Sequence, residues 1–167
     1  MKTQVENRKT IFLSSPQCIF FDTGALIALF NINKSEEVIA DQILDHIEQH
    51  PHASRHVVSA SMVELFYKLR KYGVRADVAK QNFDHLGITF FPISVKDDIS
   101  IFNSYCSFGY SVEFDYADYF ICNAALKFKA SHVLTIDRND IGFALTKAYH
   151  IPLACGEVAL ITFPRND

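Results

Sequence analysis

The stretch FDYADYFICNAALKFKASHVLTIDRND, residues 114 to 140, combines a helical pattern, a short apolar strand and acidic residues on both sides of them. Apolar residues at positions 117, 121, 124 and 128 recur at steps of four, three and four. This spacing predicts an amphipathic helix over residues 115 to 129. The run from 132 to 136 is apolar and mostly β-branched, as in a buried strand. Asp115 and Asp118 therefore begin a helix, and Asp137 follows a strand.

Two further acids occupy equivalent places in the chain. Asp22 is the first polar residue after an apolar strand predicted at residues 18 to 21. Glu64 is predicted in the first turn of a helix, residues 61 to 72, that follows a strand at 56 to 59. In parallel α/β sheets the carboxyl ends of the strands and the amino ends of the helices meet at one edge, where such sheets bind ligands. We therefore expect convergence there of Asp22, Glu64, Asp115, Asp118 and Asp137.

A cluster of carboxylates predicts a cation. Carboxylates held close together repel one another and raise their own pKa values, so such a cluster stays ionised mainly when a cation neutralises it. Hard oxygen ligands without thiolate or imidazole favour Mg²⁺ or Mn²⁺. Ions of this kind activate water and stabilise the leaving oxygen of a phosphodiester. The expected chemistry is metal-dependent phosphodiester hydrolysis.

These motifs resemble the PIN-domain ribonucleases, and within that family the VapC-like toxins of toxin–antitoxin pairs. The resemblance extends from about Cys18 to about position 150. It implies a PIN-like fold. Asp115 resembles an extra acid that some members of the family carry, and it would be a further metal ligand. Asp140 lies where some members carry another acid. The family usually has Ser or Asn where this chain has Gly24, so one polar contact near the metal is expected to be weaker. The catalytic acids that the resemblance implies are Asp22 in FFDTGALIALF, Glu64 in SASMVELFYKL, Asp118 in YADYFICNAALKFKASHVLTID and Asp137 in LTIDRND.

The resemblance also implies partners. The substrate would be single-stranded RNA from the translation machinery, and a small antitoxin protein would cover the site. Residues 34 to 50 and 64 to 72 are expected to offer it an apolar groove, and similar proteins often form homodimers. Contacts with RNA phosphates need basic residues, but the formal net charge of the chain is −3. We therefore expect a local group of basic residues to guide the RNA. The candidates for substrate binding are Lys68, Lys71, Arg75 and Arg138.

Each acid also has a structural interpretation that involves no metal. Ser61 and Glu64 have the spacing of a capping box, Asp115 suits a helix N-cap, and Asp118 suits the positive end of a helix. Asp22 would end a strand and cap the helix that follows. At the level of function, one alternative is a non-catalytic member of the same fold that binds RNA or a protein. Another is a haloacid-dehalogenase-like phosphatase, which needs an acid at position 24, where this chain has Gly24.

Composition is consistent with one globular domain. The chain has 167 residues, of which 49% are hydrophobic and 15 are Phe. We interpret residues 1 to 17 as a polar N-terminal extension and residues 18 to 163 as a single domain. No apolar run approaches the roughly 20 residues that span a bilayer, which favours a cytoplasmic protein.

The histidines are not expected to bind metal. His46, His50 and His52 are interpreted as a solvated helix end. His56 and His132 stand at the starts of predicted strands, on the edge opposite the acids.

The alternation of patterns predicts the fold class. It is α/β, with a three-layer α/β/α sandwich and a mainly parallel central sheet. Helices are predicted at about 35 to 50, 61 to 72, 75 to 86, 95 to 107, 115 to 129 and 139 to 149. Strands are predicted at about 18 to 21, 56 to 59, 88 to 93, 132 to 136, 152 to 154 and 157 to 163.

Overall fold

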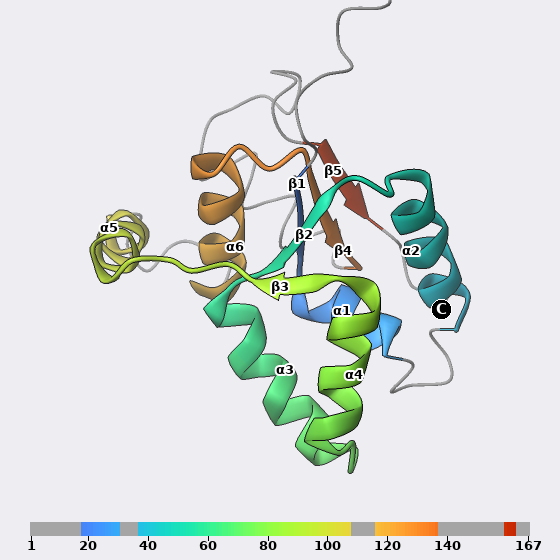
Figure 1. The fold of residues 1–167 in the computed structure, drawn as a ribbon. Coiled ribbons are helices and arrows are strands. Elements are labelled where there is room, and N and C mark those ends of the chain that lie inside the picture. Colours follow the sequence, from blue (N-terminus) through green and yellow to red (C-terminus); the bar gives the residue numbers. More distant parts are fainter. Residues whose placement is uncertain (1–17, 31–36, 108–115, 137–158, 163–167) are drawn as a thin grey trace, which may run out of the picture.

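The structure is a computed structural model that describes residues 18–30, 37–107, 116–136 and 159–162. Strands and helices alternate along the chain as the sequence predicts (Figure 1). The strands are β1 (Cys18–Phe21), β2 (Ser54–Val57), β3 (Ile88–Phe90), β4 (His132–Thr135) and β5 (Ala159–Thr162). The helices are α1 (Thr23–Leu29), α2 (Glu37–Gln49), α3 (Ser59–Lys71), α4 (Ala76–Leu86), α5 (Val95–Cys106) and α6 (Tyr116–Lys127).

The strands form a five-stranded sheet in the order β3-β2-β1-β4-β5, and every pairing in it is parallel. In the central strand β1, Phe20 pairs with His56 of β2, and Phe21 pairs with Leu134 of β4. Because parallel neighbours are joined by helical crossovers, the loops after β1, β2 and β4 emerge at the same edge. The predicted α/β class with a parallel sheet is confirmed.

Helices cover both faces of this sheet, and the alternation of side chains along β1 shows why. Ile19 and Phe21 are fully buried in a core shared with α1, α2, α3 and α4. Phe20, which lies between them in sequence, is buried in a second core with α5 and α6. Successive side chains of a strand point to opposite faces, so a strand that is apolar throughout needs cover on both sides. The result is the predicted three-layer α/β/α sandwich.

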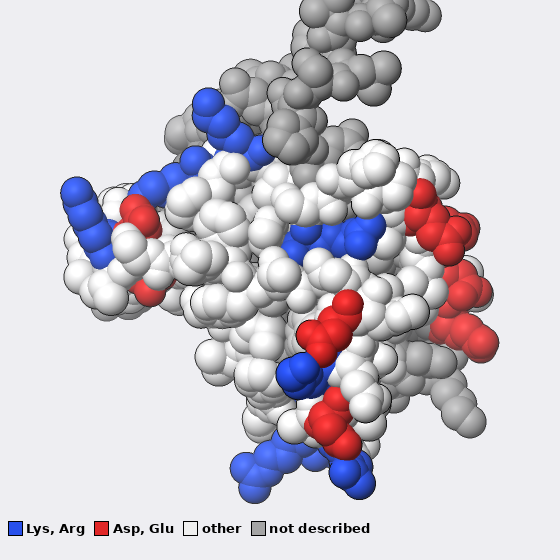
Figure 2. Space-filling view, viewed as in Figure 1, with Lys and Arg blue, Asp and Glu red and all other residues white. Residues whose placement is uncertain are grey.

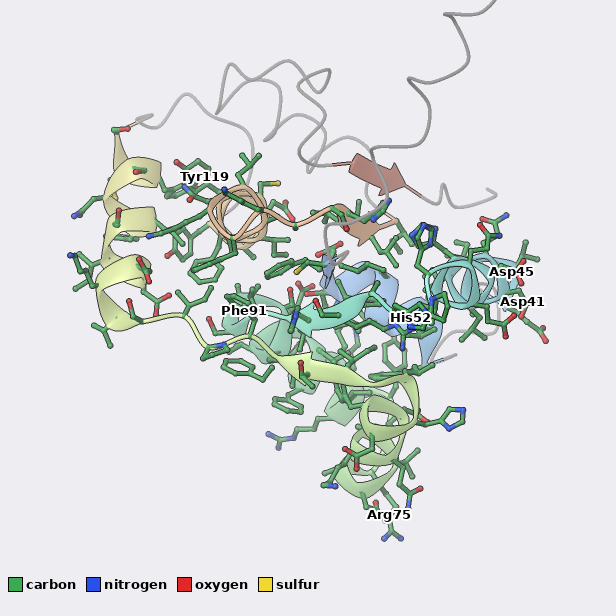
Figure 3. All side chains as sticks on the ribbon, turned by 45° about the horizontal axis from the view of Figure 1, so that its top comes forward. Asp41, Asp45, His52, Arg75, Phe91 and Tyr119 are labelled. Atoms are coloured by element: carbon green, nitrogen blue, oxygen red, sulfur yellow. The ribbon has the colours of Figure 1, made fainter. Side chains whose placement is uncertain are left out.

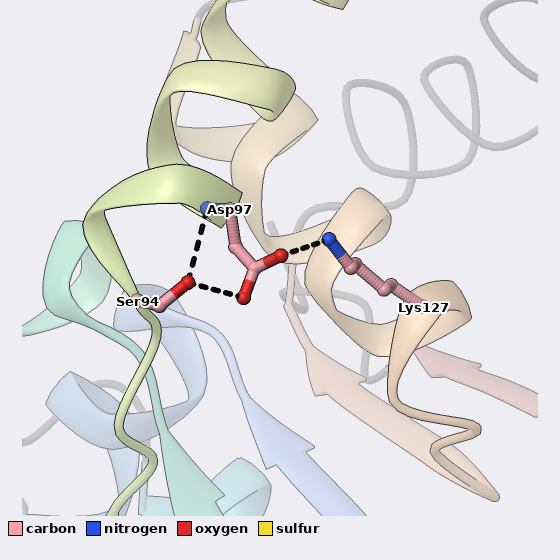
Figure 4. A network of polar contacts seen from close by, with 3 residues as sticks. All are labelled: Ser94, Asp97 and Lys127. Atoms are coloured by element: carbon pink, nitrogen blue, oxygen red, sulfur yellow. Dashed lines mark hydrogen bonds and ion pairs between the residues drawn. The ribbon is translucent and has the colours of Figure 1, made fainter.

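A polar network attaches the outer helix α5 to α6 (Figure 4). Ser94 is the N-cap of α5, and its hydroxyl accepts a hydrogen bond from the backbone N–H of Asp97 and donates one to Asp97 Oδ2 at 2.6 Å. Lys127, the last residue of α6, donates to the other carboxylate oxygen. Lys127, followed by Ser94, holds the pKa of Asp97 below its ordinary value. The beginning of α5 is thus fixed to the end of α6.

The bounds of two predicted elements were wrong, and one helix was not predicted. Strand β2 spans residues 54–57 instead of 56–59, and α3 begins at Ser59 with Val58 as its N-cap. Ser61 therefore lies inside the helix, so the capping-box interpretation of Ser61 and Glu64 is wrong, and Glu64 lies in the second turn. Helix α1 was not among the predicted helices, because TGALIAL is apolar on almost every side and carries no amphipathic pattern. The helix predicted at 139 to 149 and the strand at 152 to 154 lie outside the described residues.

Among the described residues, no helix is long and apolar enough to cross a membrane.

Candidate metal centre

Asp22 lies at the centre of the carboxyl edge of the sheet. It follows β1 directly, and its backbone N–H donates to the carbonyl of Leu134 in β4 at 2.9 Å. Its side chain is only 7% exposed. Oδ1 accepts from the backbone N–H of Thr23 at 2.6 Å, and Oδ2 accepts from Thr135 Oγ1 at 2.8 Å. The carboxylate is therefore held in one orientation by both neighbouring elements.

The cap interpretation of Asp22 is confirmed, since it is the N-cap of α1. Capping does not use up its ligand capacity. An ionised carboxylate offers about four acceptor positions on its two oxygens, and Thr23, Thr135 and the backbone of Gly24 all donate to them. Roughly one position is left for a cation.

The electrostatics of Asp22 also suit a cation. Burial raises the pKa of Asp22 from 3.8 to about 6, against the lowering effect of hydrogen bonds from Thr135 and from the backbone of Thr23 and Gly24. The nearby carboxylate of Glu64 raises this pKa further. Among the described residues, no lysine, arginine or histidine forms an ion pair with Asp22. A buried carboxylate without a basic partner is costly in its ionised form, and a bound divalent ion removes that cost.

Helix α3 is positioned against β1 by two buried hydroxyls, and this brings Glu64 toward Asp22. Ser61 is fully buried and its Oγ donates to the carbonyl of Phe21 at 3.3 Å. Thr23 Oγ1 donates in return to the carbonyl of Ser61 at 3.4 Å. Glu64 lies one turn after Ser61 and is exposed to solvent. These contacts explain why the charge of Glu64 acts on the pKa of Asp22.

Asp118 approaches from the opposite layer. It lies in the first turn of α6, as predicted, and is half-buried. Cys122, one turn further along α6, is fully buried, and burial followed by the charges of Asp118 and then Asp22 raises the pKa of its thiol. One thiol thus lies within the field of both carboxylates. The structure places Asp22, Glu64 and Asp118 around the same edge of the sheet.

The other predicted site residues cannot be placed in the same way. Asp115, Asp137, Arg138 and Asp140 lie outside the described residues. The oxygens of Asp22, Glu64 and Asp118 do not form a group that lies within 4.8 Å of one another in the part of the chain that the structure describes. An Mg²⁺ or Mn²⁺ ion keeps several waters, so among the described acids it would bind one or two carboxylates directly. The donors are all oxygen, which also suits these ions.

Gly24 is explained by packing. A Cβ added at this position would lie 2.6 Å from Ile136 Cγ1, 3.2 Å from Ile136 Cδ1 and 3.4 Å from Asp22 Oδ2. Ile136, the residue that follows β4, is itself buried. The Ser or Asn expected from the family pattern would therefore collide with Ile136, so the glycine and the isoleucine fit each other. The sequence alone shows the substitution at 24 but not the side chain that accompanies it.

The predicted substrate-binding cations lie at varying distances from the acids. Lys68 and Lys71 are in the last turn of α3, and Arg75 is the N-cap of α4. Figure 2 shows basic side chains gathered at the tip formed by the end of α3 and the start of α4, and Figure 3 shows Arg75 pointing outward there. Lys68 is one turn from Glu64, whereas Lys71 is roughly 10 Å further along the helix than Glu64. Arg75 forms an exposed ion pair with Asp77 at 2.9 Å.

Several residues that shape the site were not predicted from sequence. They are Thr23, Ser61, Cys122 and Thr135. Thr135 had a signal, because it is a polar residue in the apolar run HVLTI. The others had none, since their roles depend on contacts between β1, α3 and α6.

Neither a scan against models of protein families nor a search of curated proteins found a match for this chain. The resemblance to the PIN-domain ribonucleases thus depends on the motifs quoted above.

Proposed function

We propose that this protein is a metal-dependent endoribonuclease of the PIN type. The observation that carries the proposal is the environment of Asp22. It is a buried carboxylate, oriented by Thr23 and Thr135, with its pKa raised to about 6 and with the charge of Glu64 beside it. A buried carboxylate with a perturbed pKa, beside other acids at the carboxyl edge of a parallel sheet, is a typical feature of an active site.

The metal would be held by Asp22, Glu64 and Asp118, with Asp115 and Asp137 as proposed further ligands. A bound Mg²⁺ or Mn²⁺ supplies a polarised water and neutralises the charge that develops on the scissile phosphate. The contribution of the protein is to hold the carboxylates in place. Thr135 fixes the orientation of Asp22, and the Ser61–Phe21 and Thr23–Ser61 hydrogen bonds fix the position of α3, which carries Glu64.

The proposed substrate is RNA, guided by basic residues near the acids. Lys68 lies one helical turn from Glu64 on α3. Lys71 and Arg75 extend the basic surface toward the tip, and Arg138 is proposed to act near Asp137. Contacts of this kind neutralise phosphates without reading sequence, and binding should weaken as salt is raised.

An antitoxin protein and a second copy of the chain are proposed as partners. Support comes from the outer face of α3, where Val63 is 73% exposed, Tyr67 is 65% exposed and Phe66 is 53% exposed. Apolar side chains exposed next to one another are typical of surfaces that bind other proteins. A partner that covers α3 would also cover Glu64 and Lys68, and so would block the proposed site.

The proposal is tested by cleavage of a mixed pool of structured and unstructured RNAs, with Mg²⁺, with Mn²⁺ and with EDTA. The comparison is between wild type, Asp22→Asn and the control Asp41→Asn. Asp41 is an exposed acid that points away from the sheet on α2 (Figure 3). We expect cleavage that needs the metal, survives in Asp41→Asn and is lost in Asp22→Asn.

Retained RNA binding without cleavage by wild type under every condition would favour the non-catalytic binding module. The phosphatase alternative predicts a different result, which is release of phosphate from small phosphoesters with the RNA left intact.

A further inference from the structure

Three imidazoles meet at the edge of the sheet opposite the acids. His46 lies in the last turn of α2, His50 follows the end of that helix, and His132 is the first residue of β4. Their ring centroids are 4.3 Å apart for His46 and His50, and 5.1 Å apart for each of the other two pairs. One ring nitrogen from each residue lies within 4.8 Å of the other two. The sequence interpretation of a solvated helix end did not anticipate that His132 joins this group.

Hydrogen bonds determine which nitrogen of His50 is available. His50 Nδ1 is 2.9 Å from the backbone carbonyl of His46, and a carbonyl can only accept, so Nδ1 carries the hydrogen. In the neutral ring, Nε2 then has a free lone pair. Metal-binding histidines usually donate their other ring N–H to a carbonyl or a carboxylate in this way.

The same reasoning applies to His132 through Ser131. His132 Nδ1 is 3.0 Å from Ser131 Oγ. Ser131 Oγ donates its own hydrogen to the carbonyl of Cys18 at 2.9 Å, so it accepts from His132. It also accepts from the backbone N–H of Cys18 at 2.9 Å, which uses its second lone pair. The neutral ring of His132 is therefore left with a lone pair on Nε2.

His46 provides an independent indication of a ligand. Its Nε2 is buried and has no hydrogen-bond partner. An unsatisfied buried polar atom destabilises a protein, so a native structure that keeps one needs a reason for it. Burial, followed by the neighbouring His50 and His132, lowers the pKa of His46 to about 4, and burial also lowers the pKa of His132. Both rings are thus in the neutral form, which binds metals.

We propose that His46, His50 and His132 form a binding site for Zn²⁺ or a transition-metal ion of similar softness. A water molecule would complete the coordination. Imidazole suits Zn²⁺, whereas Mg²⁺ and Mn²⁺ prefer the oxygen ligands at the other edge. The three rings are half-buried, so an ion can reach them from solvent. In tetrahedral zinc sites the ligand nitrogens are roughly 3.3 Å apart. The three ring nitrogens lie within 4.8 Å of one another, so each pair has to approach by no more than about 1.5 Å to bind the ion.

The surroundings favour a cation at this place and suggest its effect. The exposed face of α2 carries Glu37, Asp41, Asp45 and Glu48. Figure 2 shows acidic side chains gathered along this side of the molecule, and in Figure 3 Asp41 and Asp45 point outward from α2. Such a surface raises the local concentration of cations. A bound ion would join α2 to β4 and so stabilise the edge of the sheet that is remote from the acids.

The test uses the full chain without an affinity tag, titrated with Zn²⁺ by calorimetry and with Co²⁺ by visible absorption. Wild type should bind one Zn²⁺ and give the Co²⁺ absorption bands of a site with nitrogen ligands. His132→Gln should weaken Zn²⁺ binding by about a hundredfold or more, since even loss of a hydrogen bond that supports a ligand typically weakens binding 10–100-fold. Ser131→Ala should weaken it by about tenfold or more for that reason. The matched control is His52→Ala, an exposed histidine just beyond the group.

Three results would overturn the proposal. They are no Zn²⁺ binding by wild type, unchanged binding in His132→Gln, and a loss in His52→Ala as large as that in His132→Gln. Should His132→Gln fail to fold by circular dichroism, His50→Gln replaces it, because His50 lies beyond the end of α2 and its loss leaves the core intact. Asp22→Asn should keep full Zn²⁺ affinity, which separates this site from the acids and makes the test independent of the proposed nuclease activity.

Discussion

Thr135 Oγ1 donates a hydrogen bond of 2.8 Å to Asp22 Oδ2, and both residues are buried. This contact joins the last residue of β4 to the residue that follows β1. It orients the carboxylate and lowers its pKa against the effect of burial. The first prediction concerns this contact.

Thr135→Val keeps the shape of the side chain and removes the donor. We expect the pKa of Asp22 to rise above its value of about 6, because the ionised carboxylate loses a hydrogen bond. The measurement is a titration of the Asp22 carboxyl carbon by NMR. Thr135→Ser keeps the hydroxyl and serves as the control. An unchanged pKa in Thr135→Val would show that the hydroxyl does not act on Asp22.

The second prediction concerns stability as a function of pH. Asp22 has a pKa of about 6 in the folded protein and an ordinary value of 3.8. The folded state therefore binds more protons than the unfolded state between these values, so the stability contributed by Asp22 is present below pH 4 and lost as pH rises through 6. The difference corresponds to on the order of 3 kcal/mol. Without divalent ions, Asp22 should lower the free energy of unfolding between pH 4 and 7, whereas the lowered pKa values of His46, His56 and His132 raise it over the same range. The contribution of Asp22 is therefore measured as the difference between wild type and a variant without this carboxylate.

Asp22→Asn removes this titration while keeping a good helix N-cap. Between pH 4 and 7 we expect wild type to lose about 3 kcal/mol of stability relative to Asp22→Asn, with urea unfolding of both proteins as the measurement. Mg²⁺ at pH 7.5 should raise the melting temperature of wild type but not that of Asp22→Asn. Equal pH dependence in the two proteins would mean that Asp22 does not carry the shifted pKa.

The third prediction tests the fit between Gly24 and Ile136. Gly24→Ala places a Cβ 2.6 Å from Ile136 Cγ1. Overpacking of this kind costs about 1–3 kcal/mol, which exceeds the gain of about 1 kcal/mol that alanine gives over glycine in a helix. Gly24→Ala should therefore be less stable than wild type. Ile136→Ala should also be destabilised, by about 2–5 kcal/mol for the buried side chain that is lost.

The double variant Gly24→Ala/Ile136→Ala should be more stable than the sum of the two single effects by roughly 1–2 kcal/mol, because the added methyl group then occupies the space of the missing side chain. Chemical unfolding of all four proteins gives this coupling. Additive effects would indicate that some other neighbour limits the size of the residue at 24.

The fourth prediction concerns Arg55, which attaches β2 to the ends of two helices. Its Nη1 donates to the carbonyl of Leu86 at 2.8 Å, and its Nη2 lies 3.5 Å from the carbonyls of Ile47 and His50. A guanidinium can serve these carbonyls together because of its planar fork, which lysine lacks. We expect Arg55→Lys and Arg55→Met each to destabilise the protein by about 1–3 kcal/mol in urea unfolding.

Arg75→Met is the matched control, because within the described ranges the guanidinium of Arg75 pairs only with exposed Asp77, and such pairs contribute about 0–1 kcal/mol. If Arg55→Lys were as stable as wild type, a single ammonium group would serve these carbonyls as well as the guanidinium does. The planar shape of the guanidinium would then not contribute to stability. Because Arg55 also contacts the carbonyl of His50, its loss should loosen the histidine group as well.

The fold was largely predictable from the sequence, because the central strands are short and apolar throughout. The adjacent apolar residues Phe20 and Phe21 indicate a strand that is buried on both faces. The apolar residues of α6 recur with regular helical spacing. Helix α1 was missed because burial on nearly all sides removes its amphipathic pattern. The start of α3 was misplaced because Ser61 looks like an N-cap in the sequence, whereas its hydroxyl bonds the carbonyl of Phe21.

The two sites differed in how far the sequence could predict them. The acids could be found because each stands next to a predictable strand or helix end. The approach of His132 to His46 and His50 could not, because it depends on how α2 packs beside β4, and no local pattern specifies that contact. The close approach of Ile136 to Gly24 could not be predicted either, because it depends on how α1 packs against the end of β4.

The central claim is that Asp22 belongs to a site for a hard divalent ion, and binding of Mn²⁺ followed by electron paramagnetic resonance tests it most directly. Wild type, Asp22→Asn and His46→Ala should be titrated at pH 7.5 under identical conditions. The account predicts that wild type and His46→Ala bind Mn²⁺ alike and that Asp22→Asn loses the binding. Equal Mn²⁺ affinity in Asp22→Asn and wild type would contradict the account.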